Sequence, residues 1–274
     1  MPHVRINGIS LHYEEAGRGR PVVLAHGFSA TGRMWEGQVE AFRNRCRVIT
    51  YDARGQGRSE VPAALADYSQ PTMVEDLRQL IAHLGLERPV VGGLSMGGNV
   101  AVNLALAHPG ALAGVLVCDT GAGSDEPETW AGKVQRWIEI LDGPGIEAFA
   151  EDYLRDPILA DYADRSPAAR EFLRSAITSN TAAGLARGLS GVVGKRPSLY
   201  SLKDRLSALA VPAVIVVGDR DYWCTRVSEF LAATIPGAEL VVIHGSGHMT
   251  NLEEPGQFNR ALARLLDRVE GAAA

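Results

Sequence analysis

The segment around Ser95 constrains the fold of this chain more than any other, because it combines a buried strand, a sharp turn and a helix. Two valines lead into the pattern Gly93-Leu94-Ser95-Met96-Gly97, and a helix-forming stretch covers residues 100–107. In this order the serine lies at the point of the turn, where its side chain is accessible. Both glycines are then required, because the strand and helix backbones pass too closely for a Cβ atom. The segment predicts a nucleophilic serine rather than a serine that only caps a helix.

Short apolar runs recur along the chain and alternate with helical patterns. We expect eight strands, at Val4–Ile6, Ile9–Glu14, Pro21–Ala25, Arg47–Tyr51, Pro89–Gly92, Gly114–Cys118, Pro212–Val217 and Leu240–Ile243. Helices are predicted at Thr72–Leu84, Asn99–His108, Cys224–Ile235 and Pro255–Val269. This alternation predicts an α/β protein whose sheet is mostly parallel and is covered by helices on both faces.

The alternation stops between about Gly121 and Pro212, where no strand is predicted. Helical periodicity continues there, at Trp130–Leu141, Ile146–Leu154, Ala168–Ile177 and Thr181–Val193. Because the sites of open α/β sheets lie at the carboxyl ends of the strands, we interpret this stretch as a helical cap over that edge. The predicted domains are an α/β core of residues 1–122 and 204–274 and an inserted cap, or lid, of residues 123–203.

Composition excludes several classes of partner. The net charge of −5 argues against nucleic acid and against an acidic membrane surface. We expect no secretory signal, because the first residues lack an apolar segment, and no apolar run approaches the roughly 18 residues of a membrane span. Its three cysteines, an odd number, have no metal-ligand spacing, which is typical of a reducing compartment. We expect a cytoplasmic protein that acts on a small molecule, with its oligomeric state left open.

A nucleophilic serine needs a base within hydrogen-bond reach and a group that orients the base. Of the seven histidines, His248 stands out because it follows a predicted strand in the flexible loop Gly245-Ser246-Gly247-His248. From such a loop an imidazole can reach into a site, so His248 is the predicted general base.

Three aspartates are candidates for the orienting acid. The strand Pro212–Val217 is followed by Gly218-Asp219-Arg220-Asp221. We favour Asp221, because its loop can project toward an imidazole, over Asp219, which lies nearer the strand. Asp119, at the end of the preceding strand, is the third candidate, and we expect it instead to anchor the entry to the cap.

An oxyanion hole requires two N–H donors. One is expected from the backbone of Met96, directly after the nucleophile. The other is expected from Phe28, in the loop His26-Gly27-Phe28-Ser29, where the glycine permits an unusual turn. His26 itself is expected to make a structural hydrogen bond that shapes this loop.

With Ser95, Asp221 and His248 in this order, the chain resembles the α/β-hydrolase superfamily over essentially its whole length. Three blocks support the resemblance: residues 51–59 match its D-x-R-G-x-G-x-S loop, residues 92–98 the elbow of its esterase and lactonase branches, and residues 248–255 its histidine loop. Asp119-Thr120-Gly121-Ala122 with Pro127-Glu128-Thr129-Trp130 is similar to 3-oxoadipate enol-lactonases. The resemblance implies the α/β-hydrolase fold, and a serine nucleophile sets the chain apart from epoxide hydrolases and haloalkane dehalogenases.

We therefore expect a serine hydrolase that cleaves a small carboxylic ester or lactone through an acyl-enzyme, without a metal or an organic cofactor. Three other functions stay open: hydrolysis of C–C bonds in meta-cleavage products, cofactor-free haloperoxidase or perhydrolase activity, and a ligand receptor on the same fold. Possible substrate contacts near the motif loops are Trp35, Trp223 and Met249. Four cap arginines could hold a substrate carboxylate, namely Arg136, Arg155, Arg174 and Arg187.

Overall fold

The structure is a computed structural model that describes residues 2–122 and 127–271. Its strands are β1 (His3–Ile6), β2 (Ile9–Ala16), β3 (Arg20–Ala25), β4 (Cys46–Tyr51), β5 (Val90–Leu94), β6 (Gly114–Cys118), β7 (Ala213–Gly218) and β8 (Glu239–Ile243). Its α-helices are α1 (Glu36–Phe42), α2 (Gln70–His83), α3 (Met96–Ala107), α4 (Pro127–Asp142), α5 (Ile146–Tyr153), α6 (Pro157–Ala163), α7 (Pro167–Thr178), α8 (Ala182–Gly188), α9 (Lys203–Ser207), α10 (Tyr222–Thr234), α11 (Thr250–Glu253) and α12 (Pro255–Gly271). Shorter helical turns cover Gly32–Trp35, Leu65–Asp67, Leu189–Val193 and Leu199–Leu202.

All eight predicted strands are present and form one sheet in the order β1-β2-β4-β3-β5-β6-β7-β8. The pairs β1–β2 and β2–β4 are antiparallel, and every other neighbouring pair is parallel. Every residue of β5, β6 and β7 is buried, as expected where helices cover both faces of a parallel sheet. The predicted fold class, α/β with a mostly parallel eight-stranded sheet, is confirmed.

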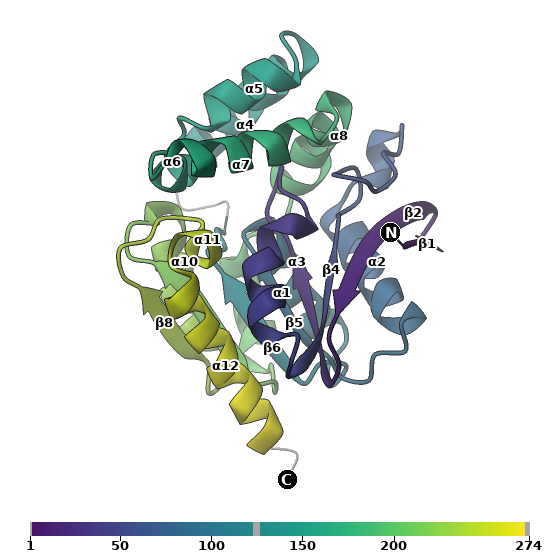
Figure 1. Ribbon diagram of the computed structural model, residues 1–274, viewed down its shortest axis with the longest axis vertical. Helices are drawn as coiled ribbons and strands as arrows, with labels where there is room; N and C mark the ends of the chain where they lie inside the picture. Colours follow the sequence, from purple (N-terminus) through teal and green to yellow (C-terminus); the bar gives the residue numbers. More distant parts are fainter. Residues whose placement is uncertain (1, 123–126, 272–274) are drawn as a thin grey trace.

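Helices pack on both faces of this sheet. On one face α12 runs along β6, β7 and β8 and also contacts α1 (Figure 1). It buries the apolar stripe Phe258, Ala261, Leu262, Leu265 and Leu266 against the strands. Helices α2 and α3 pack against each other, and α3 lies on β3, β5 and β6. The core is therefore a central sheet between two helical layers.

Helices α4 to α8 gather at one end of the sheet, beyond the carboxyl ends of its parallel strands (Figure 1). Four residues with which the predicted cap begins, 123–126, lie outside the described part of the chain. The loops after β3, β5, β6, β7 and β8 all open toward this end, because parallel strands end at the same edge. None of the helices described combines the length and apolar character that crossing a bilayer requires.

Candidate active site

Ser95 lies in a strained turn between β5 and α3, and its backbone has φ 56° and ψ −112°. A positive φ is costly for a residue with a side chain, so the surrounding structure must enforce it. A Cβ on Gly93 would lie 2.2 Å from the carbonyl carbon of Gly97, and one on Gly97 would lie 2.2 Å from the oxygen of Ala25. The prediction that both glycines let the strand and helix pass closely is therefore confirmed.

His248 and Asp221 meet at the carboxyl ends of two neighbouring parallel strands. His248 follows β8 and Asp221 follows β7, and the ring Nδ1 lies 2.8 Å from the carboxylate Oδ2. Both side chains are buried. A carboxylate at Nδ1 fixes the imidazole tautomer whose Nε2 can accept a proton. The structure thus brings together the predicted base and the favoured acid.

The pKa of His248 lies above its usual 6.5 as the net result of opposed effects. Burial lowers it, since a charged imidazolium loses its hydration. The negative charge of Asp221 and its hydrogen bond raise the pKa, and the charges of Asp119 and Glu253 act in the same direction. The site therefore stabilises the imidazolium that would form when His248 takes a proton.

Asp219, the alternative acid on the same loop, faces away from His248. Its carboxylate accepts hydrogen bonds from the backbone N–H groups of Gly245 and Ser246. It also lies 3.2 Å from the exposed ring of His244. Asp219 therefore fixes the start of the loop that leads to His248.

Asp119, the third candidate, is completely buried beside the pair. It accepts the N–H of Gly218 at 3.0 Å and the hydroxyl of Thr250. Burial raises its pKa well above the usual value, and the nearby charge of Asp221 adds to that shift. Its contacts correct the expectation for this residue: Asp119 joins the end of β7 to α11, and no contact described here ties it to the entry of the cap.

A cavity between the sheet edge and the helices above it reaches both Ser95 and His248. It is lined by Phe28, Ser95, Met96, Gly121, Trp130, Trp137, Tyr153, Ile158, Val193, Arg196, Trp223, Cys224 and His248. We call this the first cavity. A second cavity shares several of these residues and is lined by Gly27, Phe28, Ser29, Ala30, Leu94, Ser95, Tyr153, Ile158, Leu159, Leu173, Ala176, Ile177, His248 and Met249. Ser95 therefore lies where the two cavities meet.

The predicted oxyanion donors border the first cavity, and Phe28 also borders the second. Phe28 and Met96 both line the first cavity, and within residues 2–122 and 127–271 neither backbone N–H has a hydrogen-bond acceptor. Met96 is the first residue of α3, where an N–H has no partner within the helix. The arrangement leaves two N–H groups free to bind an oxyanion near Ser95.

Hydrogen bonds within the loop that carries Phe28, and between it and the loop after β4, fix its shape. The ring Nε2 of His26 accepts the N–H of Ala53 at 2.8 Å, and its Nδ1 lies 2.7 Å from the oxygen of Gly27. The N–H of Ser29 donates to the side chain of Gln56 at 2.8 Å. His26 therefore has the structural role expected for it.

Two of the three predicted substrate contacts border a cavity. Trp223 lines the first cavity and Met249 the second. Trp35 lines neither: it is fully buried and packs on Phe258 of α12, with ring centroids 5.8 Å apart. This correction has a simple cause, because the helical turn at residues 32–35 directs the indole into the core rather than toward the sheet edge.

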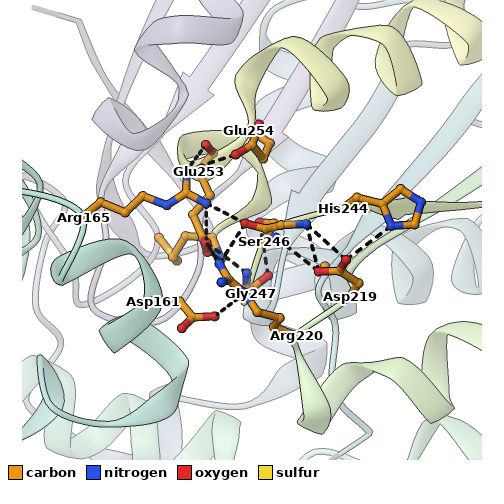
Figure 2. Close-up of polar contacts among 12 residues, drawn as sticks. Asp161, Arg165, Asp219, Arg220, His244, Ser246, Gly247, Glu253 and Glu254 are labelled. Carbon is orange, nitrogen blue, oxygen red and sulfur yellow. Dashed lines mark hydrogen bonds and ion pairs between the residues drawn. The ribbon is translucent and has the colours of Figure 1, made fainter.

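The loop that carries His248 is held by Glu253, whose side chain is fully buried (Figure 2). Its carboxylate accepts the N–H of Gly247 at 2.9 Å and the N–H of Met249 at 3.0 Å, one on each side of the histidine. Arg165, between α6 and α7, donates to Glu253 at 3.2 Å and to the oxygen of Gly245 at 2.7 Å. The histidine loop is thus fixed from within and tied to the helices above it.

We expect Glu253→Ala to lower the free energy of unfolding by about 2–5 kcal/mol, because the two buried N–H groups of Gly247 and Met249 lose their acceptor and Arg165 loses one of its partners. Glu254→Ala is the matched control, since this neighbouring carboxylate is partly exposed and contacts Arg165 at 3.1 Å, with no second ion pair among the described residues. Its expected cost is below about 1 kcal/mol. Urea unfolding followed by tryptophan fluorescence measures both. Equal losses for the two variants would contradict the role given to Glu253.

The sequence did not predict that two residues of the first cavity, Cys224 and Arg196, belong to the site. The sulfur of Cys224 lies 3.6 Å from Nδ1 of His248, and burial raises the pKa of its thiol well above the usual value. Cys224 lies three residues after Asp221 at the start of a helix, and this spacing could have indicated that Cys224 belongs to the site. For Arg196 the sequence holds no signal, because its place depends on how the inserted helices fold.

Within the described ranges, a metal could find three ligand atoms at this site. They come from Asp221, Cys224 and His248 and lie within 4.8 Å of one another. The 2.8 Å contact between the carboxylate and the imidazole already satisfies two of these groups, and burial keeps the third as a thiol. This donor set is better explained as an acid–base pair with a buried cysteine beside it.

The four arginines considered for a substrate carboxylate all have partners within the chain. Arg136 pairs with Asp152, Arg155 with Glu151, Arg174 with Glu147 and Glu151, and Arg187 interacts with Tyr68. None of them lines the first or the second cavity. They therefore stabilise the surface of the helical insertion.

A family model and several known proteins resemble this chain in sequence or structure. Residues 20–255 match the family model described as the alpha/beta hydrolase fold. A thermophilic esterase from Thermogutta terrifontis, solved with malate bound, has a TM-score of 0.87 and 34% identity, covering 98% of this chain and 99% of that one. An enol-lactonase from Burkholderia xenovorans has a TM-score of 0.86 and 28% identity, covering 97% and 100%. The 3-oxoadipate enol-lactonase 2 of Acinetobacter baylyi is 25% identical over 95% of this chain and 94% of its own length.

Proposed function

The chain belongs to the alpha/beta hydrolase fold family, and from that premise we propose that it is a serine hydrolase acting on a small carboxylic ester or lactone. One observation supports this most: the strained Ser95 and His248 border the same cavity at the sheet edge, and Asp221 contacts the imidazole Nδ1 of His248. The similarity to an esterase and to enol-lactonases supports the same reaction class.

In the proposed reaction the Ser95 hydroxyl attacks the carbonyl carbon while His248 takes its proton. The N–H groups of Phe28 and Met96 bind the developing oxyanion. His248 then protonates the leaving alcohol, and an acyl-enzyme remains on Ser95. A water molecule, deprotonated by His248, attacks the acyl carbon and releases the acid. Asp221 holds the imidazole in one tautomer and stabilises its protonated form throughout.

We propose that residues 123–203 form the cap that selects the substrate. Helices α4, α5 and α6 contribute Trp130, Trp137, Tyr153 and Ile158 to the first cavity, and Val193 and Arg196 follow α8. The core supplies Ser95, His248 and Asp221. Chemistry and specificity would then belong to different parts of the fold, as in other α/β proteins with inserted helices.

An activity panel tests the proposed function. We expect turnover of short acyl esters or of lactones, measured by release of acid at constant pH. A meta-cleavage dienoate and a perhydrolysis assay serve as the competing substrates. Turnover of the dienoate alone would favour C–C bond hydrolysis, and peroxide-dependent halogenation alone would favour the haloperoxidase alternative. Binding of an ester without turnover would instead indicate a ligand receptor.

A further inference from the structure

Arg196 brings a positive charge into the first cavity, and none of the residues that the structure describes forms an ion pair with it. One guanidinium nitrogen donates to the carbonyl of Gly121 at 3.2 Å, whereas Nε is buried and has no acceptor among the residues described. Burial lowers the pKa of Arg196 to about 10, so the group is still charged at neutral pH. Arg196 as a whole is partly exposed, whereas its unused Nε–H is buried, so this donor is available to an anionic ligand in the cavity.

The other cation near this cavity is satisfied by the chain itself. The ammonium of Lys133 lies over the rings of Trp137 and Trp223, at 5.6 Å and 5.1 Å from their centroids. It also forms an ion pair of 2.7 Å with Asp156. Because Lys133 is neutralised in this way, Arg196 is the cation of the cavity that can attract an anionic group.

A second unused donor accompanies Arg196. The indole Nε1 of Trp130 is also buried without an acceptor in the part of the chain that the structure covers, and Trp130 lines the same cavity. A carboxylate accepts several hydrogen bonds at once and gains most from charged donors. Two N–H donors and one positive charge in a wall of mostly aromatic and other apolar side chains are therefore complementary to a carboxylate.

The two cavities that meet at Ser95 differ in the charge and polarity of the side chains that line them. Arg196 and Trp130 line the first cavity and not the second. Apart from its two serines, Tyr153 and His248, the second cavity is lined by apolar side chains and glycine, with no charged arginine or lysine among them. A substrate whose reacting carbonyl lies at Ser95 would thus have an anionic group on one side and an apolar group on the other.

We propose that the substrate is an ester or lactone with a second, free carboxylate, and that Arg196 and Trp130 bind this carboxylate in the first cavity. The inference rests on the proposed function, because it places the reacting carbonyl at Ser95.

Two pairs of esters test the proposal, each differing only in one charge. The acyl side is tested with 4-nitrophenyl hydrogen adipate and its methyl ester, and the alcohol side with 4-carboxyphenyl acetate and its methyl ester. We expect the protein to prefer the charged member of at least one pair. In Arg196→Gln, kcat/KM for that charged ester should fall about 10- to 100-fold, since a hydrogen-bonded charge is lost, with little change for its neutral partner.

Lys195→Gln is the matched control. It removes the same positive charge at the neighbouring residue, which is exposed. It should leave the charge preference unchanged. Thermal unfolding without substrate separates binding from structure: Arg196→Gln should change Tm little, since Arg196 is partly exposed and its hydrogen bond to Gly121 is part-buried. Lowered Tm together with equal losses on charged and neutral esters would show a structural role and overturn the proposal.

Failure of this inference is distinguishable from failure of the proposed function. Turnover of the neutral esters without any charge preference would leave the hydrolase intact and refute the carboxylate site. If no ester is turned over, adipate binding to Ser95→Ala, followed by tryptophan fluorescence, still decides: saturable quenching that Arg196→Gln abolishes supports the carboxylate site, and its absence refutes it.

Discussion

Ser95→Ala is expected to lower kcat by about 10⁴- to 10⁶-fold, the loss typical when a catalytic nucleophile is removed. The variant loses the atom that would carry the acyl group, while the N–H groups of Phe28 and Met96 can still bind an oxyanion. Alanine has the same Cβ as serine, so the strained backbone at φ 56° gains no new clash. With 4-nitrophenyl acetate, the rapid first release of nitrophenol should disappear.

Ser207→Ala provides the matched control for this prediction. Ser207 ends α9, and its hydroxyl donates to the backbone oxygen of Asp204 at 2.9 Å, so the same hydroxyl is lost far from the cavity. Its kcat and its nitrophenol burst should equal those of the unchanged protein. A full burst from Ser95→Ala would mean that another group forms the acyl-enzyme, and the proposed mechanism would fail.

The sheet was predictable because its signal is local. The central parallel strands β5, β6 and β7 are buried on both faces, and each appears in the sequence as a short apolar run. Helices α1, α9 and α11 have only four to seven residues, too few to display a helical period. They were therefore missed.

In the insertion, two residue pairs that end in proline are easily misinterpreted from the sequence. Asp156-Pro157 and Ser166-Pro167 indicate breaks between helices, and in the structure each pair starts a helix. The side chain of Asp156 accepts the N–H of Ile158, and that of Ser166 accepts the N–H of Ala169. A capping side chain followed by proline is a helix start, since proline lacks only an N–H that would have no partner there. Helix α6 was missed for this reason.

The candidate site also contains residues that could be predicted from the sequence and residues that could not. Ser95, Asp221 and His248 could be predicted because each follows a strand, and parallel strands end at one edge. The environment of Arg196 could not, since it depends on how the inserted helices pair their charges. Only the structure shows that Arg174 contacts Glu147 while Arg196 borders the cavity.

The second large effect is expected for Asp221→Asn, which should lower kcat by about 10⁴-fold, as the same change does in a serine protease triad. An amide can donate an N–H to Nδ1 of His248 and so stabilise the wrong tautomer. His248 must be neutral to accept a proton, so activity falls as the pH drops through its pKa. Because Asp221 raises that pKa, its loss should move the acidic limb of the kcat/KM profile to lower pH.

Asparagine at the two other aspartates makes the assignment falsifiable. Asp219→Asn should keep kcat within about threefold, because its carboxylate contacts His244 and backbone N–H groups rather than His248. Asp119→Asn should cost less than about tenfold and leave the acidic limb nearly in place, since burial already disfavours the charged form that the amide replaces. If Asp119→Asn moved that limb as far as Asp221→Asn, Asp119 would be the charge that sets the pKa of His248. The geometric pair of Asp221 and His248 would then not be the catalytic one.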